Sequence, residues 1–415
     1  MSLLTHNSLP KFNHQCMITT LLVVIALVFV AFKSLSWCAN YTDTVGKLYA
    51  RLFIWLQETC GLTLVRARLN SIEKTNKDAQ TFIGSYSKWF YWVMCLDEYR
   101  MRAYQNSIRA LVNEGKGPTV WLDVGAGAHT PLTLLILKYL KYVHAVESNG
   151  LTFKCATALK RTLEVKTQDR ITLHNCYSTE LDATAIEPQP EAVIHDIVGT
   201  VASNEGAVSA IRDVFRRFPR VTRMIPRKFS TLCVPVSRPT VSFTSSLASI
   251  FFGGAWYISE EAGVQCLYNP SRSTWMSTPA SVEEYGVAEM KTSVHGNKGG
   301  EKSRVFSISR SDYCVGLFFS PLINCSDHEN DEDTTIHGLL QNTNWGVEYV
   351  SFGREGIYLE AGDQLKVNFV AHVDGECPTY SVDVLGIRKV YLGKPLPQRL
   401  SATQQWKGPQ DNMLL

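Results

Sequence analysis

The stretch TVWLDVGAG at residues 119–127 decides the fold. Its first six residues are mostly apolar and end in Asp123–Val124, as in a strand buried on both faces of a parallel sheet. Gly125 and Gly127 follow directly, and residues 131–142 have the composition of an apolar helix. Glycines at such a turn let the backbone approach a ligand, and the N-terminus of a helix offers unpaired N–H groups. The stretch therefore predicts a strand, a ligand-binding turn and a helix.

Strand-like and helix-like segments alternate around this stretch. Apolar strands are predicted at 143–146, 171–173 and 192–198, and helices at 151–165 and 204–218. Such alternation indicates a parallel sheet covered by helices, and hence an α/β domain. After about residue 226 the segments become short and rich in β-branched and aromatic residues, which predicts a second, mostly β domain.

The next strand ends in an acid, Glu147, within HAVES (residues 144–148). A carboxylate at that point can accept hydrogen bonds from both hydroxyls of a ribose. One Gly-x-Gly alone is weak support for a cofactor site, because a glycine turn and a surface acid occur together by chance. The paired placement of the glycines and Glu147 favours a nucleoside-containing cofactor.

The overall charge and the cysteines argue against two kinds of partner. The chain has 41 basic and 38 acidic residues, a formal net charge of +3, which gives no strong reason to expect a nucleic acid. Its 11 cysteines are scattered without a C-x-x-C pair. We therefore expect no metal site, and an odd number of cysteines without a framework fits a reducing compartment.

An uncharged apolar run occupies residues 17–32 near the N-terminus. If Lys33 snorkels, residues 17–38 are long enough for one transmembrane helix. A cleaved signal peptide is the alternative, because small residues occur near position 38. The run exceeds the usual length of a signal peptide's apolar region and only Lys11 supplies a basic residue before it, so we favour the anchor.

Basic residues set the expected topology. Lys33, Lys47 and Arg51 follow the apolar run, which places the body of this single-pass membrane protein in the cytosol. Residues 47–68 have an amphipathic pattern. Such a helix either lies on the membrane surface or packs on the domain that follows.

Seven short motifs occur in a fixed order along the chain. They are MCLDEYR (94–100), WLDVGAG (121–127), HAVE (144–147), HDIVG (195–199) followed by Asn204 and Glu205, IPRKF (225–229), SDY (311–313) and TNW (343–345). Over roughly residues 82–390, they resemble the protein arginine methyltransferase family. The resemblance implies a class I S-adenosylmethionine (SAM)-dependent, Rossmann-like methyltransferase domain followed by a β-barrel domain.

We accordingly divide the chain into six parts. These are an N-terminal tail (1–16), a transmembrane helix (17–38), a juxtamembrane helical segment (39–80), a SAM-binding Rossmann-like domain (81–227), a β-barrel domain for substrate and dimerisation (228–394) and a C-terminal tail (395–415). Family members are typically dimers that use an arm inserted in the barrel domain. Residues 246–286 are apolar enough to be that arm, or else a buried barrel hairpin.

The resemblance implies a SAM site made by five residues. Arg100 would hold the SAM carboxylate, because a guanidinium can bind a carboxylate with two hydrogen bonds. Asp123, Gly125 and Gly127 would form the floor of the site, and Glu147 would bind the ribose.

The resemblance also implies a substrate clamp. Asp196 and Glu205, nine positions apart, match the two acids that grip a substrate guanidinium. A free guanidinium is a poor nucleophile because its charge and lone pairs are delocalised, and two carboxylates can pull charge toward one nitrogen and fix the attack distance. Met94 would wall the pocket. Asn344 replaces the usual histidine; it can hydrogen-bond to an acid such as Asp97 but cannot carry a proton.

Three functions follow as hypotheses. The first is methylation of arginine in membrane-proximal proteins, by a homodimer or a heterodimer. The second is a catalytically weak scaffold that pairs with an active subunit, which the replacement of histidine by Asn344 favours. The third is a small-molecule N-methyltransferase, which nothing in the sequence excludes.

Overall fold

The fold is described from a computed structural model, which describes residues 42–65, 88–115, 117–252, 254–255, 257–291, 301–327, 331–341, 343–373, 378–387 and 400–407, with four isolated positions between 31 and 38. The predicted tail at 1–16 lies outside these residues, and so does the predicted transmembrane helix at 17–38, apart from those four positions. Within the described ranges, no helix is both long and apolar enough to cross a membrane.

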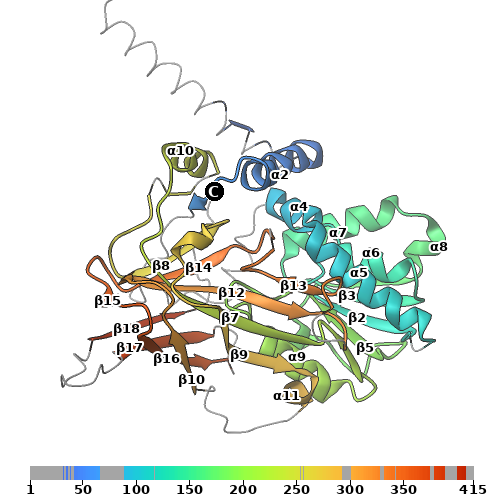
Figure 1. The fold of residues 1–415 in the computed structure, drawn as a ribbon. Helices are drawn as coiled ribbons and strands as arrows, with labels where there is room; N and C mark the ends of the chain where they lie inside the picture. The colour runs from blue at the N-terminus through green and yellow to red at the C-terminus, as the bar shows by residue number, and fades with distance from the viewer. Residues whose placement is uncertain are drawn as a thin grey trace, which may run out of the picture.

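A five-stranded parallel sheet forms the first domain. Its strands follow the order β4-β3-β2-β5-β6, with β2 at the centre (Figure 1). They are β2 (Val120–Val124), β3 (Tyr142–Val146), β4 (Ile171–His174), β5 (Ala192–His195) and β6 (Arg223–Ile225). The chain turns to one side of β2 for β3 and β4 and to the other side for β5 and β6. A crevice for a ligand is expected at that switch, at the carboxyl ends of the strands.

Helices cover this sheet. They are α4 (Lys88–Leu96), α5 (Glu98–Asn113), α6 (Pro131–Leu137), α7 (Gly150–Thr162), α8 (Val165–Gln168), the 3₁₀ helix η2 (Ser178–Glu180) and α9 (Ala207–Arg217). Local chemistry fixes where several of them begin. The side chain of Asn149 accepts hydrogen bonds from the N–H groups of Leu151 and Thr152 at the start of α7. Pro131 opens α6, at the position where a helix has no use for an N–H.

The second domain is β-rich. A seven-stranded sheet has the path β1-β8-β14-β12-β7-β9, with β13 paired to β12; β10-β16-β17-β18 form a second sheet, and β11 pairs with β15. The strands are β1 (Leu64–Val65), β7 (Lys228–Val236), β8 (Gly263–Tyr268), β9 (Ala280–Gly286), β10 (Glu301–Ser307), β11 (Asp312–Cys314), β12 (Gly316–Asn324), β13 (Thr335–His337), β14 (Val347–Ser351), β15 (Ile357–Leu359), β16 (Gln364–His372), β17 (Thr379–Ile387) and β18 (Leu400–Lys407). No sheet closes on itself among the described strands, so the predicted barrel is not confirmed.

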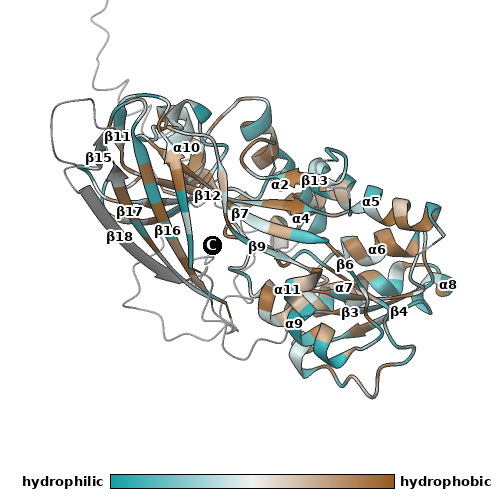
Figure 2. Cartoon of the chain, turned by 60° about the horizontal axis from the view of Figure 1, so that its bottom comes forward, coloured by the Kyte–Doolittle hydropathy of each residue, from teal (hydrophilic) through white to brown (hydrophobic). Residues whose placement is uncertain are grey.

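The two larger antiparallel sheets pack through their apolar faces. Buried and partly exposed residues alternate along β16, which shows as alternating brown and teal in Figure 2. The ring centroids of Phe319 on β12 and Phe369 on β16 lie 5.6 Å apart, and Phe369 stacks in turn on Tyr380 of β17 at 5.8 Å. This aromatic contact between the sheets forms the centre of the β-rich core.

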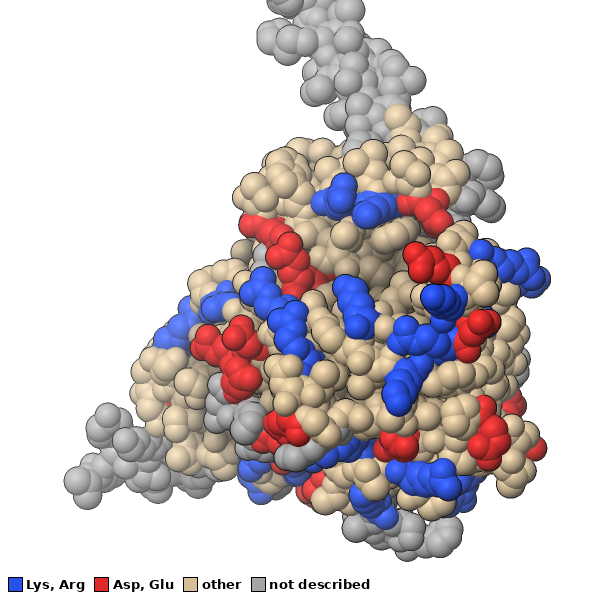
Figure 3. Space-filling view, turned by 90° about the vertical axis from the view of Figure 1, so that its right-hand side faces the viewer, with Lys and Arg blue, Asp and Glu red and all other residues tan. Residues whose placement is uncertain are grey.

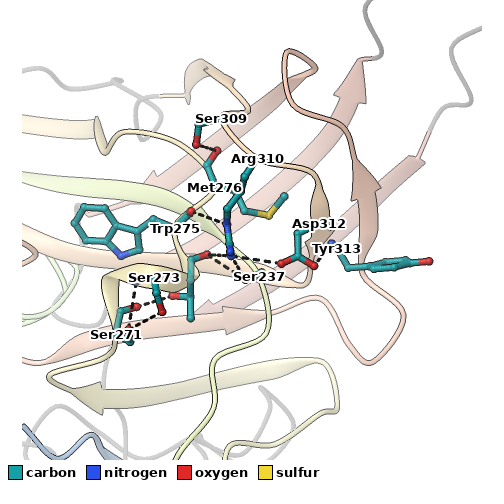
Figure 4. Close-up of polar contacts among 10 residues, drawn as sticks. Ser237, Ser271, Ser273, Trp275, Met276, Ser309, Arg310, Asp312 and Tyr313 are labelled. Carbon is teal, nitrogen blue, oxygen red and sulfur yellow. Dashed lines mark hydrogen bonds and ion pairs between the residues drawn. The ribbon is translucent and has the colours of Figure 1, made fainter.

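A partly exposed network of polar contacts ties the end of β7 to the start of β11 (Figure 4). Arg310 donates from Nε to the carbonyl of Trp275 at 3.1 Å and from Nη2 to Ser237 Oγ, and its guanidinium lies 3.4 Å from Asp312. Ser309 Oγ donates to the carbonyl of Met276 at 3.1 Å. These bonds add to the backbone pairing of the segment around the 3₁₀ helix η3 (Arg272–Thr274), where Trp275 forms a bridge with Val236 of β7.

The segment after the predicted membrane run packs on both domains. Helix α2 (Asp43–Glu58) buries Tyr49 and Phe53, which contact Trp89 of α4 and Phe252 after α10 (Phe243–Phe251). Of the two expectations for residues 47–68, the structure shows packing on the following domain. The helix ends at Glu58, earlier than predicted.

Two other expectations need correction. Residues 246–286 are not one arm, because β8 and β9 within this range are strands of the seven-stranded sheet. Outside the sheets lie the part with α10 and the connection between β8 and β9, which contains η3. The tail predicted from 395 contains β18, which pairs with β17 along its full length. Backbone groups at a sheet edge pair without needing an apolar pattern, so composition alone gave no sign of this strand. Residues 395–399 and 408–415 lie outside the described residues.

Charges on the outer face of the parallel-sheet domain are mixed. Figure 3 shows basic and acidic side chains interspersed there. The short helix α11 (Val287–Lys291) lies beside α9 and carries both signs, with Glu289 and Lys291.

The α2 contact yields a stability prediction. Phe53 is 3% exposed and lies between Trp89, Phe252 and Tyr268. Phe53→Ala should lower the free energy of unfolding of this unit by about 3–5 kcal/mol, because the cavity left behind cannot fill. Denaturant titration followed by tryptophan fluorescence measures the change, and Leu48→Ala on the exposed face of the same helix should alter it little. Equal stabilities of the two variants would contradict the packing described.

Candidate functional site

The predicted site residues meet at the carboxyl ends of β2, β3 and β5. The turn after β2 is tight: Gly125 has φ 78° and Gly127 φ 72°, conformations that favour glycine. The N–H groups of Gly125 and Ala126 both donate to the carbonyl of Val146 at 3.0 Å. A Cβ on Gly125 would lie 2.6 Å from Ile197 Cγ2. The glycine is therefore required by both backbone conformation and space.

Glu147 locks this turn to the end of β3. Its Oε2 accepts from the N–H of Gly127 at 2.9 Å and its Oε1 from the N–H of Asn149 at 2.8 Å. Burial raises the pKa of Glu147, while the two backbone hydrogen bonds oppose that shift. Each oxygen keeps a second lone pair, so the carboxylate can still accept hydrogen bonds from a ribose.

Asp123 lies beneath the turn and is fully buried. Its Oδ2 accepts from Thr133 Oγ1 of α6 at 2.6 Å, and its Oδ1 has no hydrogen-bond partner among the described residues. Burial raises the pKa of Asp123 to about 7. This places Asp123 as a support of the glycine turn.

Arg100 is the buried cation of the site. Its Nη1 donates to Asp196 Oδ2 at 3.1 Å, its Nε lies 3.7 Å from Asp97 Oδ2, and its guanidinium lies 3.5 Å from the ring centroid of Trp345. Burial alone would lower the pKa of Arg100, but Asp196 and Asp97 outweigh it and raise the pKa. Arg100 Nε has no hydrogen-bond acceptor among the described residues. A buried guanidinium donor of this kind suits a ligand carboxylate.

Asp97 joins the helix that carries Arg100 to the β-rich domain. One oxygen caps α5 by accepting the N–H of Arg100 at 3.1 Å, and the other accepts the N–H of Asn344 at 2.8 Å. The predicted contact between Asp97 and Asn344 is therefore present, but it uses the backbone of Asn344. The side-chain amide nitrogen of Asn344 is buried without an acceptor among the described residues.

Asp196 extends β5 into the site. Tyr104 on α5 donates from its hydroxyl to Asp196 Oδ1 at 3.1 Å and to the carbonyl of His195 at 2.8 Å. Burial raises the pKa of Asp196, and the nearby Arg100 and Tyr104 oppose that shift.

Glu205 lies in the loop before α9. The sequence predicted a helix starting at Asn204, but α9 begins at Ala207 after Gly206, which has φ 80°. Asn204 instead closes the loop: a Cβ on Gly199 would lie 2.7 Å from Asn204 Cγ and 3.1 Å from Glu205 Cγ. The turn from 199 to 205 is therefore tight.

Two residues place Glu205 relative to the glycine turn. Burial, with further contributions from Glu147 and Glu205, raises the pKa of Tyr91. A Cβ on Gly127 would lie 3.3 Å from the ring of Tyr91. Glu205 thus lies within electrostatic range of Tyr91, whose ring lies beside Gly127. Met94 is half-buried in α4, and its carbonyl accepts the N–H of Asp97 at 3.3 Å.

The acid loop rests on buried carboxylates that sequence reasoning missed. Glu283 of β9 accepts hydrogen bonds from the N–H and the hydroxyl of Ser203, and Glu348 of β14 accepts from Thr200 at 2.7 Å. Glu348 stands between Val347 and Tyr349 in a buried strand, which is the signal that could have found it, whereas Glu283 is followed by Glu284 and its pattern does not single it out. Tyr104 and Trp345 were also given no role, although both stand in or beside the quoted motifs.

No metal cluster is present in the part of the chain that the structure describes: no three His, Cys, Asp or Glu side chains are grouped to hold an ion.

Comparisons with known proteins identify the fold. No protein-family model matches the chain. The Arabidopsis thaliana protein arginine methyltransferase 10, solved in an open conformation, superposes with a TM-score of 0.57 at 16% identity, covering 78% of this chain and 99% of that chain. A Trypanosoma brucei PRMT1 enzyme–prozyme heterotetrameric complex with AdoHcy superposes with a TM-score of 0.57 at 13% identity, covering 80% and 99%.

Asp123 makes the stability of the domain depend on pH. The pKa of Asp123 is about 7 in the folded protein and 3.8 in the unfolded chain. Between these two pH values the carboxyl keeps its proton in the folded state but has lost it in the unfolded state. Over that window the contribution of Asp123 to stability falls by roughly 4 kcal/mol, at about 1.4 kcal/mol per pH unit. Asp123→Asn lacks this loss, so it should gain stability relative to wild type as the pH rises. Urea denaturation at about pH 4 and about pH 8 measures it; a difference between the two proteins that does not change with pH would contradict the assignment.

At these identities the two comparisons establish architecture alone: a Rossmann-like domain followed by a β-rich domain, the fold that protein arginine methyltransferases have.

Proposed function

We propose that the chain is a SAM-dependent methyltransferase that acts on arginine side chains of proteins. One observation carries this proposal: the buried guanidinium of Arg100 keeps an unused Nε donor, and an acid, Glu205, lies within electrostatic range of Tyr91, whose ring lies beside Gly127. Arg100 thus offers a binding position for a small anionic group, and Glu205 offers one for a cation. SAM carries both a carboxylate and the methylsulfonium that supplies the methyl group.

Different residues of the site would bind the cofactor and the substrate. Arg100 would hold the SAM carboxylate and Glu147 the ribose hydroxyls, while the glycine turn gives the backbone close approach. Glu205 would hold the substrate guanidinium by charge-assisted hydrogen bonds, which orient one nitrogen toward the methyl group and draw positive charge away from it. Met94 would exclude water from one side. In the hypothesis drawn from the sequence, Asp196 holds the substrate guanidinium together with Glu205.

A catalytically weak scaffold is the second candidate. It is favoured by the contact between Arg100 and Asp196, which engages one predicted clamp acid before any substrate binds, and by the absence of a titratable side chain at Asn344. A dimer, with a second copy or with a related subunit, fits both candidates and is part of the proposal.

The first experiment separates an enzyme from a scaffold. Wild type should bind SAM in calorimetry and methylate an Arg-Gly-rich peptide. Glu205→Gln should leave the SAM affinity nearly unchanged but slow methyl transfer by roughly a hundredfold or more, because one preorganised charged contact is lost. Glu284→Gln, a half-exposed acid paired with Lys228, is the matched control and should behave as wild type. Wild-type rates in Glu205→Gln would remove Glu205 from the mechanism, and SAM binding without any transfer would favour the scaffold.

We also propose that residues 17–38 anchor the protein in a membrane, with the body in the cytosol. The apolar composition of this run supports the proposal. The full chain should stay with membranes through high-salt and carbonate washes, and deletion of residues 1–40 should release it. The sequons at Asn40 and Asn324 should stay unglycosylated. Extraction of the intact chain by carbonate would refute the anchor, and a glycosidase-sensitive mass shift would refute the topology.

A further inference from the structure

Helix α2 carries two large apolar side chains on the face that it turns away from both domains. Thr44, Leu48, Arg51, Trp55 and Glu58 are all exposed and recur at intervals of three or four residues, so they form one stripe along the helix. Leu48 is 61% exposed and Trp55 is 50% exposed. We call Leu48, Arg51 and Trp55 the outer stripe. Leucine, tryptophan and arginine on one exposed stripe are typical of helices that lie at a membrane surface.

The inner face of α2 fixes the direction in which the outer stripe points. Tyr49 and Phe53 are buried. Their rings contact Trp89 of α4 and Phe252 after α10. The helix cannot rotate about its axis without exposing these aromatic rings to water, which is costly. The outer stripe therefore stays on the surface of the molecule, at the end where α2 and α10 lie (Figure 1).

The apolar run that is proposed as an anchor ends against this helix. Leu35 packs against the aromatic cluster of α2 and α4, and the N–H of Thr42 donates to the carbonyl of Cys38 at 3.0 Å. The end of residues 17–38 and the start of α2 are therefore in contact. If the run crosses a bilayer, the lipid surface lies at the N-terminal end of α2.

The length of α2 distinguishes two orientations on such a surface. The helix has 16 residues and is about 24 Å long. If it stood upright, Trp55 in its last turn would lie far from the lipid with its exposed ring in water. If it lies along the surface, Leu48 and Trp55 both reach the headgroup region, where an indole with an apolar body and a polar N–H is favoured. The outer stripe therefore favours the flat orientation.

Few charges of α2 are available to the lipid. Arg51 is exposed, whereas Lys47 Nζ lies 5.1 Å from the ring centroid of Trp92 on α4. Asp43 and Glu58 stand at the two ends of the helix. Because these charges nearly cancel, attraction to anionic lipids adds little, and burial of the apolar side chains carries the contact.

The far end of α2 lies near the candidate site. Burial, with further contributions from Asp97 and Glu98, raises the pKa of Glu58. The C-terminal end of α2 is therefore within electrostatic range of the start of α5, the helix that carries Arg100. A membrane that contacts α2 along its length would lie close to the candidate site as well.

We propose that the outer stripe of α2 lies in the headgroup region of a phospholipid bilayer beside the anchor, and that the site consequently acts on arginine side chains close to the membrane surface. The lipid contact rests on the proposed anchor, and the substrate class rests on the proposed methyltransferase function.

The first test measures the accessibility of the outer stripe in the full chain, reconstituted in phosphatidylcholine bilayer discs. Hydroxyl-radical oxidation is read by mass spectrometry and divided by the rate of each free amino acid. Leu48 and Trp55 should be at least about threefold better protected than Tyr313, because lipid excludes water from them. Tyr313 is the matched reference, since it is 54% exposed on β11, away from α2. Adding phosphatidylserine should change the protection little.

The second test measures methyl transfer to the same Arg-Gly-rich peptide, either free or tethered to lipid. Leu48→Ser combined with Trp55→Ser removes the apolar contact at exposed positions and leaves the anchor and the proposed site residues intact. It should keep the wild-type rate on the free peptide and lose about threefold or more on the tethered peptide, because the site is no longer held at the surface. Tyr313→Ser is the control variant and should behave as wild type on both.

The outcomes separate this inference from the two proposals on which it rests. Extraction of the intact chain by carbonate would overturn the anchor and the lipid contact together. Retention in the membrane, with Leu48 and Trp55 as reactive as Tyr313, would overturn the lipid contact alone. Protection found in discs that hold two copies but absent from discs that hold one would assign the outer stripe to a second copy of the chain and overturn the lipid contact. Protection without transfer to either peptide would support the lipid contact and overturn the substrate class.

Discussion

The burial of one guanidinium, that of Arg100, is the constraint on which the site depends. A charge removed from water must find partners or neutralise, and arginine does not neutralise in proteins. Its partners come from three places: Asp97 at the start of α5, Asp196 at the end of β5 and Trp345 in the β-rich domain. Loss of either carboxylate would leave this buried charge less well compensated. The ion cluster therefore fixes the parallel sheet, its first helices and the second domain relative to one another.

A second set of buried carboxylates extends this coupling to the acid loop. Glu283 and Glu348 belong to strands of the β-rich domain, yet their hydrogen-bond donors, Ser203 and Thr200, belong to the loop that carries Glu205. Burial raises the pKa of Glu283, and its hydrogen bonds with Thr231 and Ser203 oppose that shift. Because such carboxylates are costly to bury without donors, the loop conformation and the domain interface are stabilised together. The second domain thus supports the loop that carries Glu205 in the proposed substrate site.

The N-terminal helix α2 also joins the two domains. Its aromatic residues fill a space between α4 of the first domain and α10 of the second, and Tyr49 donates its hydroxyl to the carbonyl of Phe251 at 2.7 Å. If residues 17–38 anchor the chain, this packing would hold both domains close to the anchor, with Leu48 and Trp55 on the outer face of the helix.

Local features were readable from the sequence. The strand, turn and helix at 119–137 and the acid at Glu147 depend on contacts within a short stretch, so residue pattern and glycine chemistry suffice to predict them. The change to a β-rich domain near residue 226 is also a matter of composition, and the ordered motifs pointed to the methyltransferase fold. The start of α9, the pairing of β18 and the open strand order of the described β sheets could not be read in this way.

What the tertiary structure alone decided is which partner each polar group has. The motif predicted that Asp196 binds the substrate. Only the three-dimensional arrangement shows that Arg100 and Tyr104, both more than ninety positions away in the sequence, donate hydrogen bonds to its two oxygens. Likewise the motif paired Asp97 with the side chain at 344, whereas the fold presents the backbone N–H of that residue. The physical reason is that a sequence pattern records the type of a side chain, while the charge and hydrogen bonds it meets are set by elements distant in the chain.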